Sequence, residues 1–311
     1  VEQNGWLTCT SPHHFALYPY TNICPQCINE GRFVYHKANK PKSGVIGAIT
    51  SKLLAGFIHA ILQSRYPDIQ ILRGKEPVDI IILDNTTTIP TVLFGEIKAS
   101  PLMTFPLCVS SNILQSHTSY SVDVAQTPIS IFLPNNQYLL GYSDDTEWAI
   151  RGILRLLDET DFFTQYNYHW QKAFKAYAIK DHTPIYWLTN GCGQPVPRPA
   201  DWVKRQDGGG YESISDSKTS VGMDRTDDIK KGIYQIFNLS VSGKSSSNYA
   251  YKVALISNIH AVRHYDDYLA QFADVVWGHE QSDVLFNLFD GIIALTQVVA
   301  RDEWVKTVFD L

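Results

Sequence analysis

The sequence predicts an α/β fold in which a mixed β-sheet is flanked by helices. Apolar residues recur at helical spacing over residues 44–63 and again after Thr226, which we expect to be an N-cap. Two continuous apolar runs, 78–83 and 91–98, are rich in β-branched residues and predict strands buried on both faces. A further strand is expected over 251–259, after a flexible link at 240–247.

Composition narrows the class of protein. The 311 residues carry a formal net charge of −5, which argues against a protein that coats nucleic acid without sequence preference. A site-specific DNA enzyme remains compatible, since its basic residues can gather in one cleft. No run of about 18 apolar residues is present, so we expect no membrane partner. The odd count of five cysteines favours a reducing cytoplasm over a secreted disulfide framework.

Two carboxylates and an amine lie at the ends of the two central strands. Pro77-Val78-Asp79 precedes one apolar run, and Glu96-Ile97-Lys98 closes the next. Residues two apart share a face of a strand, so Glu96 and Lys98 should project together. If the strands form a hairpin centred between Thr87 and Thr88, Asp79 lies opposite Glu96. Two carboxylates with a carbonyl and waters suit Mg²⁺, and Lys98 could orient water or stabilise phosphate charge.

These motifs resemble those of the PD-(D/E)XK nuclease superfamily, with one residue inserted between the proline and the first acid. The resemblance implies a restriction-endonuclease-like mixed sheet, built as helix, three antiparallel strands, helix and parallel strand. It also implies that Asp79 and Glu96 bind the catalytic Mg²⁺ and that Lys98 acts on water. Some members carry an acid on the first helix, whereas residues 44–63 contain none. The number of catalytic metals therefore stays open.

The resemblance makes residues 100–222 an insertion that reads DNA. Basic residues in or near its Gly-rich part, with three polar residues on the following helix, are the candidate DNA contacts: Arg198, Lys204, Arg205, Lys218, Arg225, Lys230, Lys231 and Gln235. Arginine and lysine can pair with guanine, and glutamine with adenine. Within the insertion we expect a hairpin formed by 129–133 and 138–142, and a long helical region over 147–178.

A cluster of cysteine and histidine residues begins the chain. Cys24-Pro25-Gln26-Cys27 is a knuckle that can give two thiolates to a tetrahedral Zn²⁺, and Cys9 can give a third. The fourth ligand is His13 or His14, with His14 preferred and His36 in reserve. Four protein ligands would leave no open position, so a zinc ion here would be structural.

Together these observations predict four segments and one activity. The segments are a zinc-binding region (1–40), a catalytic core (41–99 and 223–260), a recognition insertion (100–222) and a C-terminal extension packing on the core (261–311). The activity is a prokaryotic, cytoplasmic, type II-like restriction endonuclease that cleaves double-stranded DNA with Mg²⁺ as a homodimer. The alternatives are a related nuclease of repair, recombination or transposition, and a non-catalytic zinc-containing DNA-binding protein.

Overall fold

The computed structural model describes residues 6–9, 15–17, 33–35, 43–102, 107–109, 128–133, 136–142, 148–179, 222–244, 248–278, 280 and 284–309. The chain forms two compact units. One comprises Val1–Lys42 and Leu102–Thr219, and the other comprises Ser43–Pro101 and Ser220–Leu311. The second unit carries Asp79, Glu96 and Lys98.

The second unit is built on a mixed six-stranded sheet, which confirms the predicted α/β class. Its strand order is β14-β13-β10-β6-β5-β4. Strands β4, β5 and β6 form an antiparallel meander, β10 pairs parallel to β6 and to β13, and β14 returns antiparallel to β13. The strand bounds are β4 Ile69–Arg73, β5 Ile80–Asp84, β6 Thr91–Ile97, β10 Ala250–Ser257, β13 Gly291–Ala294 and β14 Val298–Ala300.

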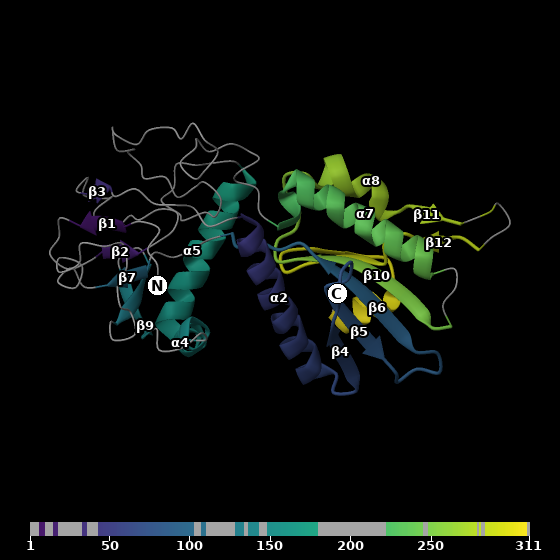
Figure 1. The fold of residues 1–311 in the computed structure, drawn as a ribbon, viewed down its shortest axis with the longest axis horizontal. Helices are drawn as coiled ribbons and strands as arrows, with labels where there is room; N and C mark the ends of the chain where they lie inside the picture. Colours follow the sequence, from purple (N-terminus) through teal and green to yellow (C-terminus); the bar gives the residue numbers. More distant parts are fainter. Residues whose placement is uncertain are drawn as a thin grey trace. The chain divides into compact units, whose positions relative to one another are not determined.

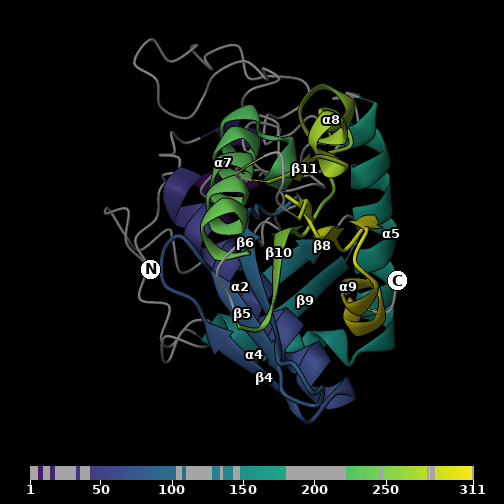
Figure 2. The ribbon, with the colours of Figure 1, turned by 90° about the vertical axis from the view of Figure 1, so that its right-hand side faces the viewer.

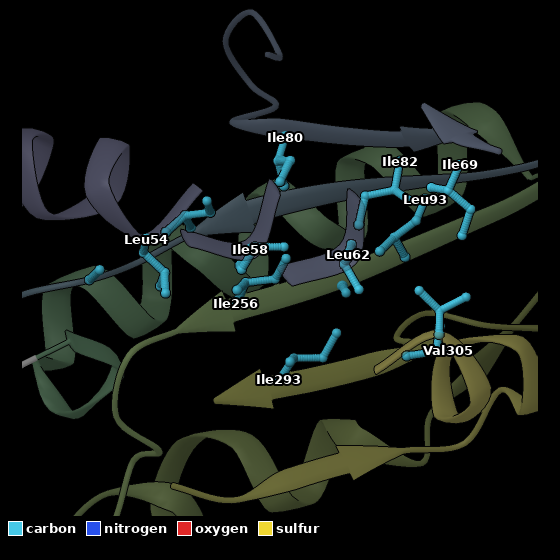
Figure 3. Packing of buried hydrophobic residues seen from close by; sticks show 14 residues of the cluster. Leu54, Ile58, Leu62, Ile69, Ile80, Ile82, Leu93, Ile256, Ile293 and Val305 are labelled. Atoms are coloured by element: carbon cyan, nitrogen blue, oxygen red, sulfur yellow. The ribbon is translucent and has the colours of Figure 1, made fainter. Parts of the chain in front are cut away.

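One face of this sheet packs against α2 (Ser43–Arg65) and the C-terminal α9 (Glu303–Phe309). Figure 3 shows Leu54, Ile58 and Leu62 of α2 meeting the inward side chains of the strands, with Val305 of α9 at the end of the same layer. The helical spacing of the α2 residues is what brings them onto one stripe. The sheet residues of this layer are Ile69, Ile80, Ile82, Leu93, Ile97, Ala254, Ile256 and Ile293.

The opposite face packs against α7 (Thr226–Gly243), which runs alongside β6 and β10 in Figure 1 and Figure 2. Its buried stripe includes Ile229, Ile236 and Leu239. A π-helical segment η2 (Tyr265–Leu269), α8 (Ala270–Ala273) and the short pair β11 (Val276–Trp277) and β12 (Phe286–Asn287) add to this layer. The sheet is thus covered on both faces, as its parallel central strands require.

Two expectations about α7 were wrong. Its N-cap is Arg225 rather than Thr226, and no side chain caps the helix there. The predicted link over 240–247 begins as helix, since α7 continues to Gly243. Ser240 is buried and its hydroxyl donates to the carbonyl of Leu288 at 2.7 Å, so tertiary contacts extend the helix through residues of low helix propensity.

The first unit contains a separate six-stranded sheet with the order β3-β1-β2-β7-β8-β9. Its strands come from the N-terminal segment and from the insertion: β1 Trp6–Cys9, β2 Phe15–Leu17, β3 Phe33–Tyr35, β7 Leu107–Val109, β8 Ile129–Leu133 and β9 Asn136–Gly141. The predicted hairpin is β8 and β9, and the predicted helical region is split into α4 (Trp148–Leu157) and α5 (Thr160–Ala178). Phe162 of α5 is fully buried beside Tyr138 of β9.

Candidate functional site

The register of β5 and β6 brings the two predicted acids together. Ile80 pairs with Gly95 and Asp84 with Thr91, so the hairpin centre lies between Thr87 and Thr88, as predicted. The ladder ends at the Ile80–Gly95 pair, so Asp79 lies one residue before β5 and outside the register that would pair it with Glu96. The N–H of Asp79 donates to the carbonyl of Gly95 at 3.0 Å, which keeps the acidic residue beside Glu96.

The carboxylate of Asp79 is fixed by the neighbouring strand. The backbone N–H of Ile97 donates to Asp79 Oδ2 at 2.8 Å. A carboxylate accepts on both oxygens, so this bond orients the group while its other oxygen keeps its capacity as an acceptor or a metal ligand.

Glu96 and Lys98 share the sheet face that α7 covers. Side chains alternate along a strand. Leu93 and Ile97 pack in the α2 layer, whereas Phe94, two residues before Glu96, packs in the α7 layer. Lys98 Nζ forms an ion pair with Glu96 Oε1, and the N–H of Lys98 donates to the carbonyl of Ile256 at 2.8 Å. The predicted common projection of Glu96 and Lys98 is confirmed.

Burial changes the acidity of Glu96. The residue is 3% exposed, and burial raises the pKa of its carboxyl to about 7. The ion pair with Lys98 opposes the rise, while the negative charges of Asp79 and Glu76 add to it. The site thus holds more negative charge than Lys98 alone balances, an environment that favours an added cation.

Helix α7 comes close to this group through a glycine. A Cβ at Gly232 would lie 2.8 Å from Leu255 Cδ1 and 3.6 Å from Lys98 Cγ. Leu255 is fully buried, so the helix could not keep its position with a larger residue at 232. The middle of α7 is therefore packed directly over the carboxyl end of β6.

The three predicted DNA contacts on α7 divide between its two flanks. Lys230 Nζ lies 5.6 Å from the centre of the Tyr268 ring, on the flank toward η2. Lys231 is exposed and precedes Gln235 by four residues, which places both on the other flank. Arg225 occupies the N-cap position without capping the helix by its side chain, and its Nε lies 3.8 Å from Asp228 Oδ2. The other candidates, Arg198, Lys204, Arg205 and Lys218, lie outside the described residues.

The predicted zinc ligands are largely outside the described part of the chain. The backbone of Cys9 ends β1, whereas His14, Cys24 and Cys27 are not described, and neither are His13 and His36. Within the described ranges, no group of three or more histidine, cysteine, aspartate or glutamate residues is arranged to hold a metal ion. Asp79 and Glu96 are two carboxylates, a number that Mg²⁺ accepts because it keeps water and phosphate ligands.

A buried acid that sequence reasoning missed anchors the start of α7. Asp224 is fully buried, and its Oδ1 accepts the N–H groups of Arg263 at 2.9 Å and His264 at 3.2 Å. Its partners follow β10, about forty residues along the chain. No local sequence pattern predicts such a hydrogen bond, because Asp224 resembles any polar residue that precedes a helix.

Comparisons of this chain with protein-family models, with curated proteins and with solved structures find no match. Among the helices of the described residues, none has the length and apolar character needed to cross a membrane.

Proposed function

We propose that this protein is a Mg²⁺-dependent nuclease that hydrolyses phosphodiester bonds in DNA. One observation carries the proposal: Asp79 is hydrogen-bonded to Gly95 and Ile97, the two chain neighbours of Glu96, and Lys98 forms an ion pair with Glu96. The order α2, the antiparallel meander β4-β5-β6, α7 and the parallel strand β10 supports it. This is the order of the PD-(D/E)XK core that the two motifs resemble, and we propose a restriction-endonuclease-like fold on that basis.

The donor set fits a hard cation. Asp79 and Glu96 would hold Mg²⁺ through carboxylate oxygens. Burial is the main cause of the raised pKa of Glu96, and the cation would relieve the repulsion from Asp79 that adds to it. A bound Mg²⁺ polarises a phosphoryl oxygen and makes water more acidic. The proposed structural zinc site is a separate one, formed by Cys9, His14, Cys24 and Cys27, whose thiolates and imidazole are ligands typical of structural Zn²⁺.

Each residue of the site has a separate task. The N–H of Ile97 holds the Asp79 carboxylate in one orientation, which lowers the cost of ordering it when a cation binds. Lys98 forms an ion pair with Glu96, and its side chain is 18% exposed, so it can turn toward a phosphate or a water that binds beside it. Its ammonium then stabilises negative charge that develops on the phosphoryl oxygens.

The substrate we propose is double-stranded DNA cut at a short sequence, with the protein acting as a homodimer so that both strands are cleaved. The division of the chain supports this, because the insertion belongs to a compact unit separate from the one that carries the acids. A unit free of catalytic constraints is suited to reading base edges.

The ion pair between Lys98 and Glu96 brings one alternative function into question. In a non-catalytic DNA-binding protein, Lys98 would neutralise Glu96 permanently and no cation would enter. An ion pair on the surface would need no explanation. This pair is largely buried, and removing two charges from water costs free energy that the attraction between them often does not recover. Such a pair therefore suggests a role in function rather than in stability. We therefore place hydrolysis first.

Cleavage of plasmid and phage DNA with and without Mg²⁺ tests the proposal. Asp79→Asn and Lys98→Ala should each reduce cleavage at least about 10²-fold while DNA binding persists. Lys306→Ala, which removes an exposed lysine of α9, is the matched control and should cut like the wild type. Discrete fragments support the restriction activity, and smearing supports a nuclease of another kind. No cleavage of any DNA by the wild type would instead support the binding protein.

A further inference from the structure

The fold leaves one amide on α7 unsatisfied. Gln235 is partly buried, and its Oε1 is enclosed without a hydrogen-bond partner in the described part of the chain. A buried acceptor that has given up water without gaining a donor destabilises the folded state. Such groups in native proteins usually have a reason, and a ligand or water at a functional site is one.

Helical geometry places Gln235 over the strands that carry the acids. Gly232, three residues earlier, faces the gap between β10 and β6, since its nearest neighbours are Leu255 and Lys98. Ile233 and Phe237 occupy one flank of α7, where Phe237 packs against Phe272 and Phe289 beside β13.

Gln235 lies on the opposite flank, on the side of β6 rather than of β13. At 100° per residue, it is rotated from Gly232 in the direction away from Ile233 and Phe237. Helical side chains lean toward the helix N-terminus, so its amide reaches back to the level of Gly232 and Lys98. Glu96 projects from this same face of the sheet.

We propose that Gln235 positions the attacking water of the reaction. This inference rests on the proposed function. The oxygens of a phosphodiester accept hydrogen bonds and donate none, so they cannot satisfy an amide oxygen. Water is the donor that hydrolysis brings to this face, and Oε1 would accept one of its hydrogens.

Gln235 orients the water without changing its charge. The water oxygen bonds to phosphorus, the bond from phosphorus to the leaving alcohol oxygen breaks, and the proton that the water loses is balanced by the one that the alcohol gains. The products are a phosphate monoester and an alcohol, with no further reactant. A fixed hydrogen bond directs a water lone pair at phosphorus and reduces the ordering needed in the transition state.

Gln235→Met tests the inference, because methionine keeps the length of the side chain and removes the acceptor. We expect kcat to fall about 10²-fold, with KM for DNA changed less than about threefold and the Tm raised by a few degrees. The rise in Tm follows because an unsatisfied buried oxygen is exchanged for an apolar group. Asn238→Met is the control: it removes an exposed amide one turn along α7 and should change none of the three values.

The outcomes separate this inference from the proposed function. A higher Tm with unchanged kcat would overturn the inference while cleavage stands. A lower Tm in both Gln235→Met and Gln235→Leu would show that the protein itself satisfies the amide, and would overturn it as well. If the wild type cuts no DNA, the proposed function fails and the water role fails with it, whereas a raised Tm would still identify an unsatisfied amide.

Discussion

Replacing Glu96 with glutamine should remove a pH dependence of stability that runs opposite to ordinary acid denaturation. Burial raises the pKa of Glu96 from 4.5 to about 7, so the folded state holds a proton that the unfolded state releases. The wild type therefore loses stability as the pH rises through this window. Since a tenfold change in an equilibrium constant is about 1.4 kcal/mol, the full loss is about 3 kcal/mol.

Glutamine carries no titrating group, so the free energy of unfolding of Glu96→Gln should lack this component. The attraction of Lys98 for the ionised carboxyl is already included in the pKa of Glu96, so the other effects of the substitution add only an offset that is constant with pH. The difference between the free energies of unfolding of the two proteins should therefore be determined at each pH, and its change with pH is the informative quantity. Between about pH 5.5 and 8 we expect that difference to change by about 2 kcal/mol in favour of the variant.

Chemical denaturation at several pH values, in buffer free of divalent cations, measures this difference. A difference that stays constant from pH 5.5 to 8 would refute the reasoning, since Glu96 would then titrate alike in the folded and unfolded chains. Mg²⁺ extends the test. At about 100 times its Kd it should stabilise the wild type by about 2.7 kcal/mol at pH 8 and Glu96→Gln by much less.

Three further predictions concern the frame around the site. Gly95→Ala should cost about 1–3 kcal/mol in denaturation experiments, because its Cβ would lie 2.6 Å from Ile80 Cγ2; wild-type stability would contradict the packing. His260 is buried, and burial lowers the pKa of its ring, while the negative charge of Asp224 opposes this shift. The wild type should therefore lose stability as the pH falls below 6.5, and His260→Leu should show a shallower loss. Trp304→Phe removes the indole donor 2.8 Å from Asp84 Oδ2 and should cost about 1.5–3 kcal/mol, measured against a Trp277→Phe control.

The sequence predicted the β5–β6 hairpin accurately because its determinants are local. Apolar β-branched runs define both strands, and the polar residues between them leave one position for the turn. Counting from this register brings Asp79 next to Glu96, although the ladder itself ends at Ile80 and Gly95. The strand β10 and the start of the preceding helix were likewise visible as periodic apolar patterns, with the N-cap misplaced by one residue.

The end of α7 could not be predicted in this way. Ser240, Ser242 and Gly243 have low helix propensity and suggest a link. The helix persists because Ser240 is held by the carbonyl of Leu288 and because Gly243 allows Tyr251 to lie against it, where a Cβ would be 2.2 Å from the ring. Both partners are distant in sequence or on another element, so no local window contains the information.

The same distinction applies to the chemistry of the site. Asp79, Glu96 and Lys98 lie within twenty residues, and a short motif was enough to predict which groups meet. Their character depends on segments far along the chain: Ile256 holds the backbone of Lys98, and α7 closes over its side chain through Gly232. Glu96 itself is buried, and burial raises the pKa of its carboxyl to about 7. The motif therefore specifies which residues meet, whereas the packing around Lys98 depends on a helix and a strand more than a hundred residues later in the chain.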